Sequence, residues 1–341
     1  MTDARLLERP AAAGTRPRIG FLGTGWIGRH RMEAMLDSGL VQAAAVADAS
    51  PAAAQDALGL APAAEICAGL DELLDLRPDG VVIATPSALH AGQAIQALEA
   101  GAAVFCQKPL GRTAAEARAV VDAARANDRL LCVDLSYRFT EGVRAIRDVA
   151  AGGGLGRIFA ADLVFHNAYG PDKPWFYDAA LSGGGCLIDL GVHLVDLGLW
   201  MLDFPEVASA SSALFAKGRR LQPGEAVVED YAVASLELAG GGTVRIACSW
   251  NLHAGRDAVI SAAFHGKDGG AEMSNVDGSF YDFRAERLTG TGRELLASPP
   301  DAWGGRAAVD WARRLSCAER FDLQAEQLVR VAEVLDRLYG R

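Results

Sequence analysis

The sequence predicts an α/β chain: an N-terminal doubly wound parallel sheet, then an α+β domain with a large, mostly antiparallel open sheet. Over the first 135 residues, short apolar runs alternate with helical patterns, which is typical of βαβ units. A glycine-rich turn joins the first apolar run to the first helical pattern. After a helical stretch that ends near residue 202, several strand-like runs follow without helices between them, which indicates antiparallel pairing.

The first part is expected to hold five clear strands and a weak one. The expected strands are Arg18–Leu22, Val41–Ala47, Gly80–Ala84, Ala103–Cys106 and Leu130–Leu135, with the weak one at Glu65–Cys67. Helical patterns lie between them, at Ile27–Ser38, Ala88–Ala100 and Thr113–Asn127. Sheets of this type bind ligands at the carboxyl ends of their strands.

The second part begins near Ser136. It is expected to contain a helix at Thr140–Ala150, a strand at Arg157–Asn167, a helix at Leu187–Leu202 and a closing helix at Gln324–Tyr339. Further strands are expected at Val207–Ala216, Asp230–Leu238, Thr243–Trp250, Ala258–His265 and around Phe280–Leu288, with a hairpin turn at Gly240–Gly242. We therefore divide the chain into a flexible tail (1–16), a dinucleotide-binding domain (17–135) and a substrate-binding and oligomerisation domain (136–341).

Composition excludes several classes of function. The formal net charge is −10, which argues against nucleic acid or an anionic membrane as the main partner. The six cysteines are scattered without metal-ligand spacing, which favours free thiols in a reducing cytoplasm and predicts no metal site. The N-terminus lacks the apolar core of a signal peptide, and no uncharged apolar window reaches transmembrane length. We expect a cytoplasmic protein.

The glycine-rich turn reads Gly23-Thr24-Gly25-Trp26-Ile27-Gly28 and matches GxGxxG, with Asp48 ending the next strand 20 residues later. In a Rossmann unit the first glycine makes the tight turn, the second lets the backbone approach a diphosphate, and the third lets helix and strand pack closely. The helix N-terminus offers free N–H groups to the phosphates. The pattern predicts a dinucleotide site that includes Trp26 and Ile27.

Asp48 also predicts which dinucleotide binds. A carboxylate there accepts hydrogen bonds from the ribose hydroxyls and repels a 2′-phosphate. The following Ala49-Ser50-Pro51 supplies no cation for that phosphate. NAD is therefore favoured over NADP.

Three more segments complete the pattern: Ala84-Thr85-Pro86-Ser87-Ala88-Leu89-His90, Cys106-Gln107-Lys108-Pro109, and the run from Gly183 to Asp196 that contains Asp189 and His193. Together with the glycine loop they resemble the glucose–fructose oxidoreductase/inositol dehydrogenase (Gfo/Idh/MocA) family, in its order and spacing and over nearly the whole chain. The resemblance implies an NAD-dependent oxidoreductase that acts on a secondary alcohol of a sugar, polyol or cyclitol. It also implies a homodimer or homotetramer, with the open sheet face available for contacts.

Asp189 and His193 are four residues apart on an expected helix, so both should project from one face. A carboxylate beside an imidazole can orient it and give an acid/base near neutral pH. Three glycines before this helix would let a ligand approach the backbone. Taken alone, the pair is better interpreted as an ordinary polar pair of a helix, and the family resemblance reverses that preference.

Lys108 is one of four lysines in a chain with 29 arginines, and it ends a strand where ligands bind. The resemblance places this lysine, in a Glu-Lys-Pro motif, against substrate and nicotinamide. Here Gln107 replaces the usual glutamate, which keeps an acceptor oxygen but loses the charge. The resemblance therefore assigns catalysis to Lys108, Asp189 and His193, with His193 as general acid/base.

Further candidates surround these three residues. Cofactor contacts are expected from Thr85, Pro86, His90 and Gln107, although His90 could instead cap or pack a helix. Substrate contacts are expected from Arg138, His166 and Trp175, the last in an aromatic loop (173–177) that could instead pack at a subunit interface. Tyr137 and Tyr177 are the competing bases, while His30, His253 and His265 suggest no role.

Two other functions stay open at this point. Some members of the family are NAD-dependent glycosidases, in which transient oxidation of the sugar drives elimination and hydrolysis without net NADH. A non-catalytic NAD-binding sensor would be expected to lose Lys108, Asp189 or His193, and all three are present.

Overall fold

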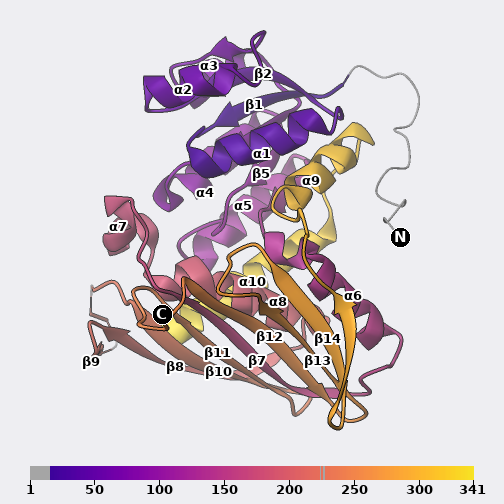
Figure 1. Cartoon of the computed structure of the whole chain (residues 1–341). Helices are drawn as coiled ribbons and strands as arrows, with labels where there is room; N and C mark the ends of the chain where they lie inside the picture. Colours follow the sequence, from indigo (N-terminus) through magenta and orange to yellow (C-terminus); the bar gives the residue numbers. More distant parts are fainter. Residues whose placement is uncertain (1–15, 223, 226) are drawn as a thin grey trace.

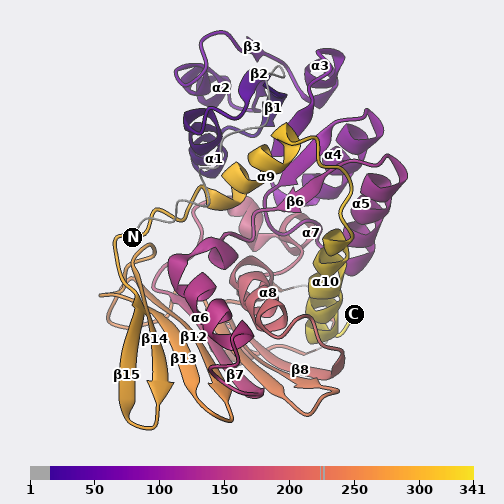
Figure 2. The same cartoon turned by 90° about the vertical axis from the view of Figure 1, so that its right-hand side faces the viewer.

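The computed structural model describes residues 16–341 except 223 and 226, and it has two lobes (Figure 1). Residues 1–15 of the expected N-terminal tail lie outside the described residues. The upper lobe contains the first sheet and its helices, and the lower lobe contains a broad sheet with helices on one face (Figures 1 and 2).

The sheet of the upper lobe is parallel throughout, in the order β3-β2-β1-β4-β5-β6. Its strands are β1 (Arg18–Leu22), β2 (Gln42–Ala47), β3 (Glu65–Ile66), β4 (Gly80–Ile83), β5 (Ala103–Cys106) and β6 (Leu131–Val133). Its helices are α1 (Trp26–Asp37), α2 (Pro51–Leu58), α3 (Leu70–Asp75), α4 (Ser87–Glu99) and α5 (Ala114–Ala126). The central strands β4 and β5 are buried along their whole length, because helices cover both faces. The predicted doubly wound sheet is confirmed.

A helix from the end of the chain completes this lobe. Helix α9 (Arg306–Ser316) packs Ala308, Trp311 and Ala312 into the same core as β1, β4 and β5 (Figure 2). Strand β4 makes room for it at Gly80, where a Cβ atom would lie 2.7 Å from the Trp311 ring. The predicted division at residue 135/136 therefore separates α9 in sequence from the sheet against which it packs.

The second sheet has the order β15-β14-β13-β12-β7-β11-β10-β8-β9, with every pair antiparallel except β7 and β11. Its strands are β7 (Ile158–Asn167), β8 (Val207–Ala216), β9 (Arg219–Arg220), β10 (Tyr231–Leu238), β11 (Thr243–Ser249), β12 (Ala258–Gly266), β13 (Gly270–Asn275), β14 (Phe283–Thr289) and β15 (Gly292–Ala297). This confirms the predicted large, mostly antiparallel sheet, and β10 and β11 pair across the expected hairpin turn. Strands β13 and β15 were not anticipated.

Helices cover one face of this second sheet. They are α6 (Glu141–Ala151), α8 (Val192–Met201) and α10 (Glu326–Tyr339). The short α7 (Ala179–Ser182) instead contacts α4 of the upper lobe. The run Ala179–Met201 has the length and hydropathy of a membrane span, but 83% of its 18-residue apolar stretch is buried inside the protein. Its apolar character is that of a core helix, since α8 packs into the centre of the second core.

Candidate active site

The glycine loop between β1 and α1 is shaped by its own backbone. Gly23 has a φ of +84°, and a Cβ atom there would lie 2.6 Å from the Ala84 carbonyl group. A Cβ atom at Gly28 would lie 2.0 Å from the Gly23 oxygen. At Gly25, by contrast, a Cβ atom would meet nothing within 4 Å. The loop therefore has no room for a side chain at Gly23 or Gly28, whereas the space beside Gly25 is free.

The open side of this loop fits a dinucleotide diphosphate. Helix α1 begins at Trp26 with no side-chain cap and no acidic residue in its first turn, so its free N–H groups can meet an anion. Asp48 accepts hydrogen bonds from the Thr24 N–H (2.6 Å) and the Ser50 N–H (2.8 Å), which holds the loop against the end of β2. These residues would hold the diphosphate of a nicotinamide dinucleotide at the start of α1.

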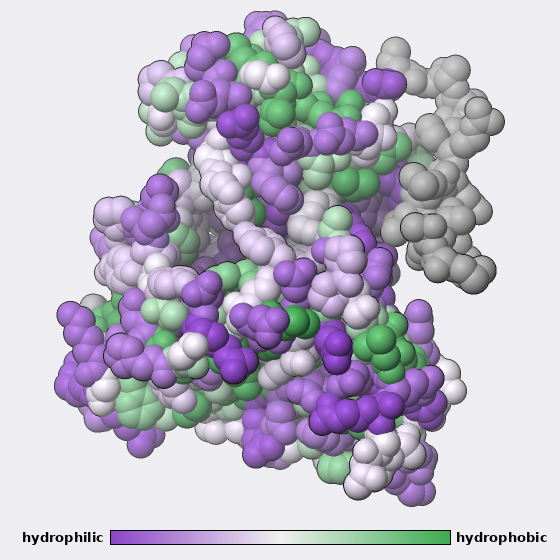
Figure 3. All heavy atoms as spheres, in the orientation of Figure 1, coloured by the Kyte–Doolittle hydropathy of each residue, from purple (hydrophilic) through white to green (hydrophobic). Residues whose placement is uncertain are grey.

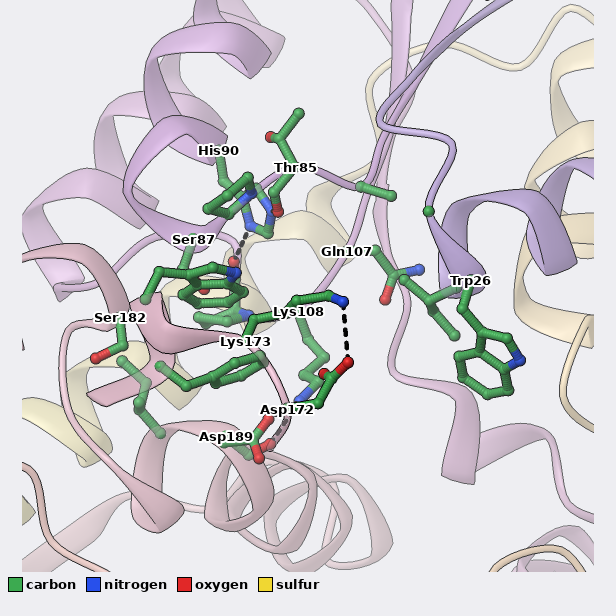
Figure 4. Close-up of a pocket in the computed structure, with 18 of the residues that line it drawn as sticks. Trp26, Thr85, Ser87, His90, Gln107, Lys108, Asp172, Lys173, Ser182 and Asp189 are labelled. Atoms are coloured by element: carbon green, nitrogen blue, oxygen red, sulfur yellow. Dashed lines mark hydrogen bonds and ion pairs between the residues drawn. The ribbon is translucent and has the colours of Figure 1, made fainter. Parts of the chain in front are cut away.

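A cavity of about 450 Å³ runs from this loop into the space between the lobes, where the surface is hollowed (Figure 3). Residues from both lobes line it, among them Gly25, Trp26, Ile27, Thr85, Pro86, His90, Gln107, Lys108, Trp175, Phe176 and Asp189 (Figure 4). Most of the predicted cofactor residues therefore line one cavity. Its walls combine an aromatic pair, Trp175 stacked on Phe176, with charged groups of both signs.

Lys108 and Asp189 meet in this cavity although they are 81 residues apart in the chain. The Lys108 amine lies 2.5 Å from the Asp189 Oδ1 and 2.7 Å from the Asp189 carbonyl oxygen (Figure 4). The Trp250 indole N–H donates to the other carboxylate oxygen at 3.1 Å. Two donors thus fix the Asp189 carboxylate, and the second, Trp250, was not anticipated because no local pattern marks it.

His193 has other surroundings than the sequence suggested. Residues 187–191 form a π-helical turn, so Asp189 and His193 are not stacked as in an α-helix, and the Asp189 carboxylate pairs with Lys108 instead of the imidazole. His193 is 7% exposed and packs against Tyr137, with ring centroids 4.9 Å apart. Within the described chain its Nδ1 is buried without a hydrogen-bond partner. Burial, and then the charges of Lys108 and Arg31, hold the pKa of His193 well below 6.5.

Gln107 is held from behind by a buried acid that the sequence did not reveal. Its side-chain amide donates to the Asp134 Oδ2 at 2.6 Å, and the Arg31 guanidinium donates to the same oxygen at 2.6 Å. Asp134 and Arg31 are 1% and 6% exposed. The negative charge that the family usually has at position 107 is therefore found one strand away, at the end of β6.

His90 is a buried link between two loops of the upper lobe. Its Nδ1 lies 2.7 Å from the Pro109 carbonyl oxygen and its Nε2 lies 2.7 Å from the Thr85 carbonyl oxygen. Burial lowers its pKa. His90 thus lines the cavity and ties the Lys108–Pro109 turn to the end of β4, while its contact with the cofactor stays a prediction.

The three glycines before Asp189 serve the protein's own packing. A Cβ atom would lie 2.7 Å from Arg112 at Gly183, 2.2 Å from the Tyr339 oxygen at Gly184, and 1.9 Å from the Glu229 carbonyl oxygen at Gly185. Gly184 also lines the cavity, so a ligand's approach to the backbone there stays a prediction.

Two expected substrate contacts lie elsewhere. Arg138 forms a two-pronged ion pair with the buried Asp196. His166 donates to or accepts from the Ser249 hydroxyl and stacks on Tyr231, on the face of β7 opposite to the buried Phe165. Arg138 was expected from the resemblance because it follows the last strand of the first sheet, and His166 because it ends a strand. Neither side chain lines the cavity. No group of three metal-ligating side chains occurs in the part of the chain that the structure describes.

Comparison with known families gives two matches that together span most of the chain. Residues 17–135 match the model described as an oxidoreductase family with an NAD-binding Rossmann fold, and residues 143–272 match that of the GFO/IDH/MocA C-terminal domain.

Curated relatives include an inositol 2-dehydrogenase of Acidiphilium cryptum, 32% identical in an alignment that covers 86% of this chain and 90% of that protein. Another is the D-glucoside 3-dehydrogenase of Escherichia coli, 31% identical in an alignment that covers 65% of this chain. The match spans 66% of that protein, and 53% of a levoglucosan dehydrogenase from Pseudarthrobacter phenanthrenivorans.

Solved structures share the whole fold. A protein of gentamicin A biosynthesis in complex with NAD is 25% identical, with a TM-score of 0.80 over 98% of this chain and 96% of that one. Levoglucosan dehydrogenase in complex with NADH and levoglucosan is 22% identical, with a TM-score of 0.81 over 96% and 97% of the two chains.

Proposed function

The chain belongs to the Gfo/Idh/MocA family of NAD-binding oxidoreductases, and from this premise we propose that it reversibly oxidises a secondary ring alcohol of a sugar, polyol or cyclitol. The observation that carries the proposal is the Lys108–Asp189 ion pair in a cavity continuous with the open glycine loop. Relatives named for glucosides, levoglucosan and inositol all act on hydroxylated six-membered rings, and Trp175 offers an apolar wall for such a ring.

NAD, when bound, supplies the hydride acceptor for the hydrogen on the carbinol carbon. The Lys108 amine hydrogen-bonds the reacting oxygen and stabilises its developing negative charge. Asp189 holds that amine in place and offers its carboxylate to a neighbouring ring hydroxyl. His193 takes the hydroxyl proton, for which its lowered pKa keeps the imidazole neutral at pH 7. The products are a ketone, NADH and a proton.

A direct screen tests the proposal. Purified protein is mixed with NAD and with cyclitols, aldoses, glycosides or sugar acids, and NADH is followed by absorbance. We expect NADH with at least one ring alcohol. Release of a free sugar from a glycoside without net NADH would instead identify an NAD-dependent glycosidase, and NAD binding without turnover of any compound would identify a sensor.

Cofactor preference is a separate expectation. We propose NAD over NADP, because the Asp48 carboxylate lies at the end of β2, where a 2′-phosphate would approach it. Comparing kcat/KM for the two cofactors tests this. Equal values, or a preference for NADP, would remove Asp48 as the discriminating residue.

We also propose that the open face of the second sheet joins copies of this chain into a homodimer or homotetramer. Val233 on this face is 36% exposed, while its neighbours along β10 are buried toward the helices. Light scattering gives the molar mass, and a monomer at micromolar concentration would contradict the proposal.

A further inference from the structure

We propose that Glu229 and Tyr339 are positioning residues for Asp189, fixing the backbone at the start of the segment that carries it; this inference rests on the function proposed above. Glu229 precedes β10 and Tyr339 ends α10, so neither is near Asp189 in sequence. Neither lines the cavity of the candidate site.

Three donors converge on the Glu229 carboxylate, which is 1% exposed. The Gly185 N–H lies 3.0 and 2.9 Å from its two oxygens, and the Leu187 N–H lies 2.9 Å from Oε1. The Tyr339 hydroxyl donates to the same oxygen at 2.8 Å. Donors alone surround the carboxylate in the described chain, so its ionised form satisfies this site.

Tyr339 extends this arrangement by one residue. Its hydroxyl oxygen accepts a hydrogen bond from the Ile188 N–H at 3.1 Å while its proton is donated to Glu229. The backbone N–H groups of residues 185, 187 and 188 are thus held by two side chains. The π-helical turn that begins at Leu187 has no side-chain cap of its own at Cys186. Asp189 directly follows Ile188, the last residue whose N–H is held in this way.

The sequence reserves space for these contacts. A side chain at Gly184 would collide with the Tyr339 hydroxyl, and one at Gly185 would collide with the Glu229 backbone. Because Gly184 and Gly185 have no side chains, the backbone N–H groups of this segment can approach the buried Glu229 carboxylate. Because Lys108 touches both the carboxylate and the carbonyl oxygen of Asp189, a shift of this backbone moves the lysine's partner directly. Displacements of about 1 Å near reacting groups can cost roughly 100-fold in rate.

Tyr339→Phe and Glu229→Gln test the proposal, with Ser212→Ala as the matched control. Ser212 donates to the Leu338 carbonyl oxygen at 2.5 Å, so it ties down the same end of α10 without touching residues 185–189. We measure kcat, KM and NADH affinity on folded protein, together with the thermal midpoint. A second readout needs no turnover: the ¹⁵N-indole signal of Trp250, whose N–H donates to Asp189, assigned among the six tryptophans by Trp250→Phe.

Tyr339→Phe is expected to lower kcat by about tenfold and Glu229→Gln by up to about 100-fold, with unchanged NADH affinity and a shifted Trp250 signal. Ser212→Ala should lower only the thermal midpoint. If Glu229→Gln does not fold, Tyr339→Phe decides alone, because it removes a single hydroxyl. Wild-type kcat with an unmoved Trp250 signal in Tyr339→Phe would overturn the inference. A wild-type enzyme that oxidises no ring alcohol would instead overturn the proposed function, and the Trp250 signal would then decide this inference separately.

Discussion

At the scale of single residues, the Asp189 carboxylate organises the candidate site. Lys108 and Trp250 each donate to one of its oxygens, so its geometry is set before any substrate arrives. His193 is left without a carboxylate partner, and its buried Nδ1 has no bond within residues 16–341 apart from the two omitted positions. His193 therefore shares no hydrogen bond with the charged pair, although the Lys108 charge helps to lower its pKa, and separate substitutions can test the two.

His193→Ala should reduce turnover by roughly 10²–10⁴-fold, the usual contribution of a positioned general base, and leave NAD affinity nearly unchanged. In the wild type, kcat/KM should fall as pH drops through the pKa of His193, because the protonated imidazole cannot accept a proton. Burial lowers that pKa, so this acidic limb should lie below pH 6.5, and the variant should lack it.

Near-normal kcat in His193→Ala would move proton transfer to another group. Tyr137 touches the imidazole ring, but burial raises its pKa, which makes it a poor base near pH 7. Tyr177, which is 51% exposed, would then be the candidate to substitute.

Gln107→Glu should weaken NAD binding by roughly tenfold, although the family usually carries glutamate there, because two carboxylates would then share one buried site. Calorimetric titration with NAD measures the loss. Adding Asp134→Asn should restore NAD binding, because the pair then again contains one carboxylate instead of two. A double variant that binds NAD no better than Gln107→Glu would contradict this explanation.

At the scale of elements, two glycines of the glycine loop serve different purposes, Gly28 in folding and Gly25 in ligand binding. Gly28→Ala forces a Cβ atom against the Gly23 oxygen and should lower the free energy of unfolding, whereas Gly25→Ala meets empty space. Gly25→Ala should therefore fold normally and bind NAD more weakly, since its new methyl group occupies the open side of the loop. Denaturant unfolding and NAD titration of both variants check this; equal NAD affinity in Gly25→Ala and wild type would place the diphosphate elsewhere.

The parallel sheet and its glycine loop could be predicted because apolar periodicity and GxGxxG are local signals. Helix α9 escaped notice because its buried residues are three alanines and Trp311, a weak apolar pattern among four charged residues. The π-helical turn at 187–191 lies in an almost continuous apolar run, where a small change of hydrogen-bond register leaves no sequence mark. The expected pairing of Asp189 with His193 failed for that reason.

At the scale of the whole molecule, the site exists only where the lobes meet. Lys108 follows β5 of the upper lobe, and Asp189 comes from the segment before α8 in the lower lobe (Figures 1 and 4). Trp250, which follows β11 of the lower lobe, donates to Asp189. The convergence of Lys108 with Asp189 was predicted from resemblance and strand order. Trp250, Asp134 and Glu229 could not be predicted, since their partners are 61, 27 and 44 residues away and no local pattern links them. The sequence also could not show that Arg138 and His166 do not line the cavity, because it gives the end of an element but not which face a side chain takes.

The most direct test of the proposed oxidation follows a deuterium atom from the ring alcohol to the cofactor. A ring alcohol that the enzyme oxidises is labelled at its carbinol carbon and incubated with NAD, and the reduced cofactor is examined by mass spectrometry. The wild type should produce deuterium-labelled NADH. Lys108→Met should produce it roughly 10²–10³-fold more slowly, because it lacks one preorganised hydrogen-bond donor. Reduced cofactor without the label, or an undiminished rate in Lys108→Met, would contradict the proposed oxidation.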